Sequence, residues 1–372
     1  MQHTCSVHLS RGWLLASGLA LAVVLAGGAP ARAANSLRIE LAEAAKKIAE
    51  VLRGQNADAV AVGEFTGPRR LRSSAGPGIA EVLTEELKKV KITVKDEANF
   101  EVKGDFLDIE DKDSEQLAAL LKIRVLDRTG KVVVEMERGI FGDQTLASLF
   151  GLTVELPPNA GDKARTQKLK ESLEQPRTHL TQTRISAGPG SPYAIEILVK
   201  SGDRYVPRAP SDEGGRAFVP IRRHELYAVR FINESPHDAA VTLTIDGINM
   251  FAFSEVKNRK TGQPQYTHVI IPAGKSGTIL GWHVNNQRSD AFLVGEYAKS
   301  PAAQLLQSSA KVGTITATFA AAWPRGGRMP DDEPPSRSGD ATVRGPEVAA
   351  KFKEVERDIG VVRASISVRY TK

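Results

Sequence analysis

The chain has 372 residues, of which 41% are hydrophobic, 25% are charged and 6% are aromatic, and its formal charge at pH 7 is +6. This composition is typical of a globular protein with room for two domains. It excludes a mostly disordered chain, a collagen-like repeat and a multi-span membrane protein.

Residues 1–33 have the features of a secretory signal peptide. Arg11 supplies a basic start, residues 13–26 form an apolar run, and the run is followed by Ala31-Arg32-Ala33, a small-residue cleavage site. The run of 14 residues is shorter than the ~20 that span a bilayer, so an uncleaved membrane anchor is the less favoured alternative. We therefore expect cleavage after Ala33 and an exported protein of the periplasm or cell surface, with no stable transmembrane segment after cleavage.

Removal of this leader changes the chemistry available to the chain. Cys5 is the sole cysteine, so the mature protein has no disulfide, no thiol nucleophile and no thiolate metal site. Arg11 and Arg32 leave without any acidic residue, which lowers the formal charge from +6 to +4. Such a mild excess does not indicate a nucleic-acid partner, which needs basic residues clustered on one face.

The first domain is predicted over residues 36–142. Apolar residues recur with helical spacing over 37–52 and again over 79–90, and residues 59–65 read as a strand between them. Three alternating runs follow, and the last two are joined by Asp127-Arg-Thr-Gly130, a good hairpin turn. The sequence thus predicts a small α+β domain in which helices pack on one face of a mostly antiparallel sheet.

Residues 143–192 are predicted to be a helical linker segment. Residues 143–150 and 162–174 are expected to be short helices. Residues 186–192 read Ser-Ala-Gly-Pro-Gly-Ser-Pro, and we expect positions 187–192 to be a hinge that sets the orientation of the two domains.

The second domain is predicted over residues 193–372. It has many strand-sized runs separated by turns, which is typical of an all-β sandwich, and Asp246-Gly247 is a hairpin signal within it. Residues 324–346 are rich in Pro, Gly, Arg and Asp and are expected to be a mobile loop. A short helix around 347–357 and a closing strand over 361–370 are expected to complete the chain.

No residue pattern indicates a catalytic, cofactor or metal site. The five histidines left after cleavage have no metal-ligand spacing, and Gly274-Lys275-Ser276 lacks the preceding glycine of a phosphate-binding loop. The acidic run 108–113 has Asp113 and Ala119 where a calcium loop needs glycine and glutamate, which leaves only a weak, irregular cation site as an alternative.

The best binding candidates are basic residues in the loop before the second helix. Arg69, Arg70 and Arg72 precede a helix start, where backbone N–H groups favour anions and guanidinium groups add bidentate contacts. A phosphate or carboxylate of a partner would dock there, the alternative being a mobile loop with solvated arginines. Asn249, Trp282 and His283 are weaker candidates in the second domain, where Trp282 is more readily explained as a core residue.

The segment Val60-Ala-Val-Gly-Glu-Phe65, the Gly-rich loop and the elements after it, over residues 37–140, resemble curli-secretion (CsgG-like) domains and the amino-terminal domains of TolB. The lipidated members of this group carry a lipobox cysteine that this chain does not have. The second half is similar to a β-rich domain without assigned activity in exported bacterial proteins of planctomycete type. The matching segments are 227–233, 242–247, 272–276 and Gly281-Trp282.

From these observations we expect a non-enzymatic, exported cell-envelope protein, an adaptor or assembly factor that binds a protein partner, without a cofactor. The alternative is an exported hydrolase or carbohydrate-binding protein, whose paired carboxylates would come from distant strands and would lie about 5–10 Å apart in a cleft. The sequence leaves the partner and the oligomeric state open.

Overall fold

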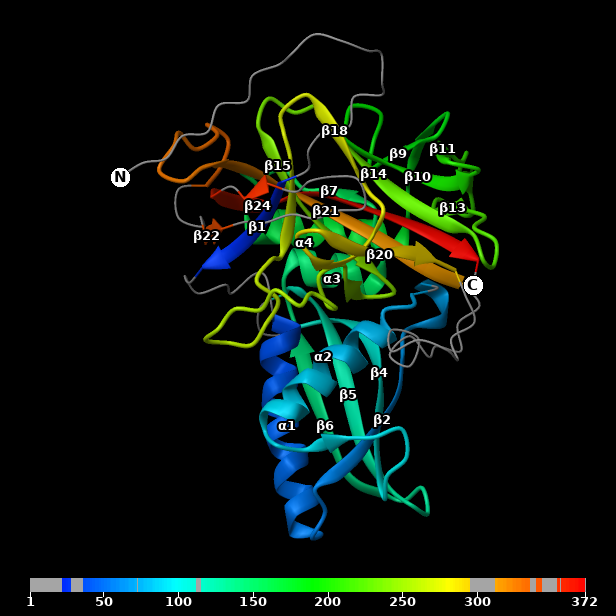
Figure 1. Ribbon diagram of the computed structural model, residues 1–372, viewed down its shortest axis with the longest axis vertical. Coiled ribbons are helices and arrows are strands. Elements are labelled where there is room, and N and C mark those ends of the chain that lie inside the picture. Colours follow the sequence, from blue (N-terminus) through cyan, green and yellow to red (C-terminus); the bar gives the residue numbers. More distant parts are fainter. Residues whose placement is uncertain are drawn as a thin grey trace.

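The computed structural model describes residues 22–27, 36–71, 73–111, 115–294, 312–334, 339–342, 353–354 and 356–371. These residues form a mixed α+β protein with a helix-plus-sheet half at one end and a β-rich half at the other (Figure 1).

The N-terminal half places two helices on one face of a five-stranded sheet. Its elements are α1 (Ser36–Gly54), β2 (Ala59–Thr66), the 3-10 helix η1 (Arg69–Leu71), α2 (Gly76–Lys89), β3 (Thr93–Val94), β4 (Phe100–Glu110), β5 (Leu117–Asp127) and β6 (Val132–Ile140). The strand order is β3-β2-β4-β5-β6; β2 is parallel to both of its neighbours, whereas β4, β5 and β6 are antiparallel. The helical spacing of the sequence is confirmed, since Leu41, Ile48, Ile79 and Leu83 are all buried against the sheet.

The next segment forms a layer between the two halves. It contains α3 (Asp143–Phe150), β7 (Val154–Glu155) and α4 (Asp162–Glu174), and both helices have the expected bounds. Leu146 and Phe150 are buried in the core of the N-terminal half, while β7 pairs antiparallel with the last strand, β24 (Arg357–Thr371). Figure 1 shows α3 and α4 lying between the two halves.

The expected hinge lies inside the β-rich half. Strands β8 (His179–Thr181) and β9 (Arg184–Ser186) form a hairpin, and β9 pairs directly with β10 (Tyr193–Ser201). Residues 187–192 are therefore the connection between two paired strands of one sheet. The Gly/Pro composition that suggested a hinge is explained by a turn within a sheet.

The β-rich half contains two sheets. Its remaining strands are β11 (Arg204–Pro207), β12 (Ser211–Asp212), β13 (Ala217–Val219), β14 (Leu226–Asn233), β15 (Asp238–Ile245), β16 (Ile248–Asn249), β17 (His268–Ile271), β18 (Lys275–Ile279), β19 (Gly281–Asn285), β20 (Arg288–Leu293), β21 (Val312–Pro324), β22 (Gly339–Thr342) and β23 (Lys353–Glu354). One sheet has the order β19-β20-β14-β10-β9-β8, and the other contains β12-β13-β24-β21-β15-β17. Residues of both sheets share one hydrophobic core, in which Phe319 of β21 packs on Tyr193 and Phe231 with ring centroids 5.1 and 6.2 Å apart.

Part of the expected leader is described. Ala22–Gly27 forms strand β1, which pairs antiparallel with β17 and β22 and parallel with β23. The other residues of 1–33 lie outside the described part of the chain. No helix in that part is both long and apolar enough to span a membrane.

Two expectations concern the C-terminal end of the chain. The helix expected around 347–357 is wrong where the structure describes it, because Lys353–Glu354 is strand and Arg357 begins β24. Strand pairing here outweighs the local helix preference of the sequence. The mobility of the 324–346 loop stays a prediction. Within this loop Glu333 is buried and pairs with Arg363 of β24 at 2.8 Å, and residues 339–341 of β22 pair with β24. Composition does not reveal such specific contacts.

The face of β24 that points away from the shared core is polar and nevertheless buried. Ser365, Ser367 and Arg369 occupy this face, and each is at most 3% exposed. The Ser367 hydroxyl donates to the Leu152 carbonyl at 3.0 Å. On β15, which is separated from β24 by β21, the Thr242 hydroxyl accepts a hydrogen bond from Gln144 of α3 at 3.0 Å. The layer of α3, β7 and α4 thus covers this polar face of the sheet. Without that layer, the polar side chains of the face would be exposed to solvent.

Candidate functional site: an arginine-lined pocket between the two halves

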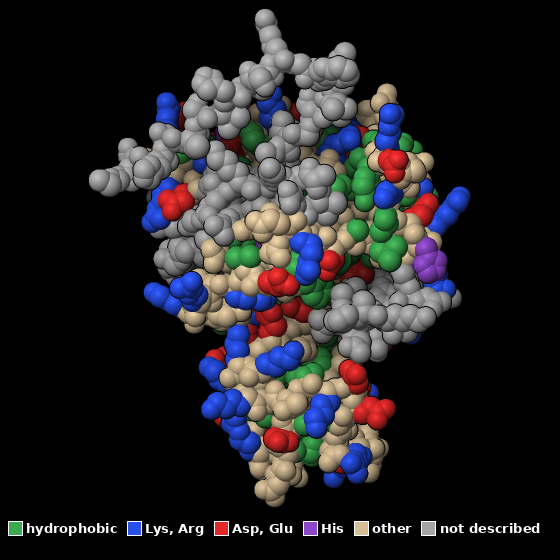
Figure 2. Space-filling view, in the orientation of Figure 1, with side chains coloured by type: hydrophobic (Ala, Val, Ile, Leu, Met, Phe, Trp, Pro, Cys, Tyr) green, Lys and Arg blue, Asp and Glu red, His purple; other side chains and the backbone are tan. Residues whose placement is uncertain are grey.

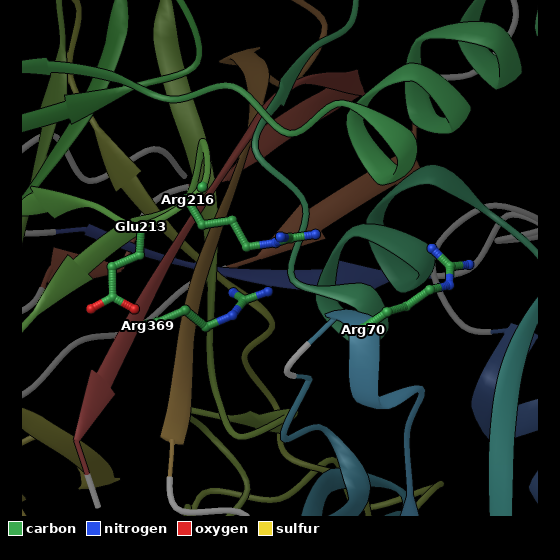
Figure 3. A pocket seen from close by; sticks show the side chains of 5 residues that line it. Arg70, Glu213, Arg216 and Arg369 are labelled. Carbon is green, nitrogen blue, oxygen red and sulfur yellow. The ribbon is translucent and has the colours of Figure 1, made fainter.

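A pocket of about 410 Å³ lies where the two halves meet. It is lined by Arg70, Glu213, Gly214, Arg216 and Arg369 (Figure 3). Arg70 belongs to η1 of the N-terminal half, Arg369 to β24, and the other three to the turn between β12 and β13. Every lining side chain is charged, apart from glycine, whereas most small-molecule pockets are predominantly apolar.

Arg369 forms the buried part of the pocket. It is 3% exposed, and its Nη2 donates to the carbonyl oxygens of Leu71, Phe150 and Gly151 at 3.1, 3.4 and 3.1 Å. Gly151 ends α3 with φ +60°, and a Cβ at this position would lie 2.6 Å from Nη1 of Arg369. A glycine is therefore required here both by the backbone angle and by the guanidinium that occupies the space of a side chain.

The turn that carries Glu213, Gly214 and Arg216 is held in place by contacts with residues 176 and 178. The Glu213 N–H donates to the Arg216 carbonyl at 2.8 Å, which closes the turn. Gly215 packs so closely on residue 176 that a Cβ would lie 1.8 Å from the Pro176 carbonyl oxygen, and the Thr178 hydroxyl donates to the Gly215 carbonyl at 2.9 Å. These contacts fix the turn before any ligand arrives, which lowers the entropy cost of binding.

Arg70 stands on the opposite side of the pocket. Its guanidinium pairs with Asp108 of β4, and the side chain is 55% exposed. In Figure 3 the guanidinium groups of Arg216 and Arg369 extend toward the side of Arg70, whose own guanidinium points away from them. Arg216 and Arg369 are thus the two cations directed into the pocket.

Exposure decreases from the rim of the pocket to its floor. Arg70, Glu213 and Gly214 are exposed, Arg216 is partly buried and Arg369 is buried. A bound group must therefore extend inward to meet Arg369. The low-dielectric surroundings of that residue strengthen any charge-assisted hydrogen bond made to it.

The arginines expected to bind an anion have different surroundings. Arg70 lines the pocket, Arg69 is exposed on the same short helix, and Arg72 lies outside the described residues. The helix start that we expected to attract the anion is already occupied by another part of the chain. Asp246, in the β15–β16 turn, accepts the Gly78 N–H on its carbonyl at 3.2 Å and the Ser74 hydroxyl on its carboxylate. The Gly78 N–H at the start of α2 is therefore bound by the Asp246 backbone carbonyl, and the Asp246 carboxylate binds the loop just before the helix.

The three weaker candidates lie together around one core. Trp282 is 9% exposed and packs edge-on against Phe253 and Phe292, and His283 is fully buried. Burial lowers the pKa of His283 to about 4, so its ring is neutral at pH 7. Asn249 accepts the Phe251 N–H at 2.9 Å and thereby closes a local turn. Burial therefore identifies Trp282 and His283 as core residues.

Other charged groups do not assemble into a metal site. Within the described ranges, no group of three or more His, Cys, Asp or Glu residues is positioned to hold a metal ion. Asp108, the first residue of the acidic run considered for calcium, pairs with Arg70. Figure 2 shows Lys and Arg interspersed with Asp and Glu over the visible face of the helix-plus-sheet half.

Sequence reasoning missed Glu213, Arg216 and Arg369. The sequence signal for the first two was the Asp-Glu-Gly-Gly-Arg turn at 212–216, and Arg369 alternates with apolar residues of the closing strand. Each signal is local, whereas the pocket depends on contacts such as Arg369 to Leu71, 298 residues apart. No protein-family model, curated protein or solved structure matches the chain, so its function has to be argued from the geometry of this pocket.

Proposed function

We propose that the protein is a non-enzymatic, exported cell-envelope adaptor or assembly factor that binds an anionic group of a protein partner in the arginine-lined pocket. The N-terminal half has the role of a CsgG-like or TolB-type docking domain. The two sheets of the second half act as a β-sandwich that supplies the turn and the strand carrying the other pocket arginines.

The observation that supports this proposal is that three arginines from distant parts of the chain line one pocket and that two of them, Arg216 and Arg369, are directed into it (Figure 3). Guanidinium groups bind carboxylates and phosphates through paired N–H donors, and they serve recognition without any reaction. A hydrolase that uses two carboxylates needs both of them in one cleft, and Glu213 is the single carboxylate among the described residues that line this pocket.

Contacts that hold the pocket lining also favour a recognition role. Arg369 donates to the carbonyl oxygens of Leu71, Phe150 and Gly151, and the Thr178 hydroxyl donates to the Gly215 carbonyl at 2.9 Å. These contacts hold the pocket walls in one geometry. Such rigidity reduces the ordering cost of binding a partner.

The test is in-cell cross-linking of the tagged, full chain, followed by envelope fractionation and mass spectrometry. We expect one dominant protein partner, which is lost from the Arg216→Ala variant. The matched control is Arg288→Ala, because Arg288 is an exposed arginine outside the pocket lining, paired with Glu255 at 3.1 Å. Recovery of no partner, or the same partner from both variants, contradicts the adaptor function.

Export is tested separately by amino-terminal sequencing of the protein recovered from the envelope fraction. A mature start at Ala34 supports cleavage of the leader. An intact leader on the envelope-located protein supports the membrane-anchored alternative instead.

A further inference from the structure

We infer that the pocket binds the C-terminal carboxylate of a partner polypeptide, an inference that rests on the proposed function in taking the partner to be a protein. The ligand chemistry follows from three properties of the pocket: its charge, its depth and its open rim.

The charges of the lining favour a carboxylate over a phosphate. Arg70, Arg216 and Arg369 are positive and Glu213 is negative, and Arg70 also pairs with Asp108. A carboxylate pairs with guanidinium groups through two parallel N–H···O bonds. A phosphate monoester carries close to two negative charges at pH 7 and is repelled more strongly by Glu213.

The depth of the pocket favours the end of a chain over a side chain in its middle. The cation on the floor, Arg369, is 3% exposed, and the exposed residues of the lining stand at the rim. A volume of about 410 Å³ is at the small end of the range for ligand pockets, ~300–1,000 Å³, so it has room for the last residues of a peptide and not for a folded segment. A polypeptide end reaches inward with its backbone carboxylate first.

The rim leaves a path for the backbone of that peptide. Gly214 has φ +64°, and a Cβ there would meet no atom within 4 Å. Its neighbour Gly215 is held against Pro176, so the turn does not have to rearrange when a chain passes over it. Capture of a terminal carboxylate by fixed donors is an established mode of peptide recognition.

The inference is tested with the full chain and a pool of labelled heptapeptides whose last three positions are randomised. The pool is made in two forms, one with a free C-terminal acid and one with a C-terminal amide, and binding is followed by fluorescence polarisation. We expect the acid pool to bind about tenfold or more tightly than the amide pool, because only the acid offers a charge-assisted acceptor to the arginines. Side-chain carboxylates occur equally in both pools, so equal binding of the two forms overturns the inference.

Three variants and two competitors make the result specific. Arg216→Ala is expected to abolish the acid preference, Arg216→Lys to retain part of it, and Arg288→Ala to retain all of it, with circular dichroism and thermal midpoints confirming that each variant is folded. At matched ionic strength, sodium acetate is expected to displace the acid pool more effectively than inorganic phosphate. Stronger displacement by phosphate overturns the charge argument.

Failure of this inference is distinguishable from failure of the proposed function. If a protein partner is captured in an Arg216-dependent way and the peptide pools bind equally, the inference is overturned and the adaptor function stands. If the acid pool binds selectively and no partner is captured from cells, the ligand chemistry stands and the adaptor function fails.

Discussion

The Ser74 hydroxyl donates a hydrogen bond to Oδ1 of Asp246, and both residues are buried although they are 172 positions apart in the chain. The same carboxylate accepts the Thr314 N–H at 2.9 Å and the Tyr370 hydroxyl at 2.9 Å. One side chain thereby joins the loop before α2 to the β15–β16 turn, β21 and β24. The two halves consequently share a hydrogen-bonded seam and are expected to unfold together.

The first prediction concerns this carboxylate. Asp246→Asn keeps a residue that tolerates the observed φ of +53°, but it replaces an acceptor oxygen by an NH₂ donor. We expect a loss of about 1–3 kcal/mol in the free energy of unfolding, because buried donors are left without an acceptor. Urea denaturation followed by circular dichroism measures this loss. Asp290→Asn, at an exposed position of β20, is the control, and an equal effect of both changes contradicts the role of Asp246.

A second prediction addresses the close approach of the two halves. Gly78 lies in α2, and a Cβ there would lie 2.3 Å from the backbone carbonyl carbon and oxygen of Gly247 in the β15–β16 turn. We expect Gly78→Ala to lower the free energy of unfolding by about 1–3 kcal/mol, because backbone atoms on both sides must move apart.

Gly54→Ala is the matched control for Gly78→Ala. Gly54 is also helical, and no atom lies within 4 Å of the position that an added methyl group would take, so alanine is expected to be neutral or to stabilise by up to ~1 kcal/mol. Thermal denaturation of the two variants compares them directly. A Gly78→Ala variant as stable as Gly54→Ala would show that the seam is not closely packed.

A third prediction isolates the placement of Arg369. Gly151→Ala introduces a Cβ 2.6 Å from Nη1 of Arg369 at a residue with φ +60°, and we expect it to displace the guanidinium and weaken peptide binding. Gly202→Ala carries the same backbone strain, with φ +58°, but no atom lies within 4 Å of its Cβ.

The comparison of these two variants separates strain from the clash. Both are expected to lose ~1 kcal/mol of stability from the positive φ, and Gly151→Ala alone is expected to lose binding of the acid peptide pool. The measurements are urea midpoints and fluorescence polarisation. Equal binding by both variants argues against a role for Arg369 in the pocket.

The fourth prediction is a pH dependence that originates in α2. Glu81 is 7% exposed, and burial, followed by the neighbouring Glu85, raises its pKa to about 8. Arg38 opposes this shift, but it is itself engaged by Glu85 and Glu86 at 2.7 Å each. The folded protein therefore retains a proton on Glu81 at pH 7, where the unfolded chain has released it.

Stability is accordingly expected to fall as the pH rises from about 4.5 to about 8, by a few kcal/mol at most, and to change little from this source above that range. Glu81→Gln mimics the protonated carboxyl and removes this part of the pH dependence. Urea midpoints at pH 5, 7 and 9 test it, with the exposed Glu43→Gln as control. If Glu81→Gln and the unaltered protein share one pH profile, Glu81 is not protonated in the fold.

Local patterns accounted for the elements that depend on neighbours in sequence. The helical spacing of Leu41, Ile48, Ile79 and Leu83 predicted α1 and α2, since one face of each helix is buried. The turn at Asp127 was predicted because its carboxylate accepts the N–H groups of Thr129 and Lys131 a few residues away. The Asp246-Gly247 turn was predicted because Asp-Gly favours the positive φ angles of a tight hairpin. Both residues adopt positive φ between paired strands.

Long-range burial was not predictable in the same way. The Ser and Thr residues on the outer face of β15, β21 and β24 have the pattern of a solvated sheet face, yet α3 and its neighbours cover them. The Gly/Pro segment after β9 resembles a domain boundary because turns inside sheets use the same residues. The candidate site depends on long-range contacts such as that of Arg369 with Leu71. Arg70 is therefore the one charged lining residue that was identified from sequence.

The contact between Arg369 and Leu71 also determines when the pocket can form as the chain is synthesised. A chain made from its amino end presents η1 long before the strand that carries Arg369, because 298 residues separate the two. Until that strand pairs, Arg369 cannot reach the Leu71 carbonyl, and the pocket lacks its buried cation. We therefore expect a partly synthesised or truncated chain to have no complete pocket and not to bind the proposed partner.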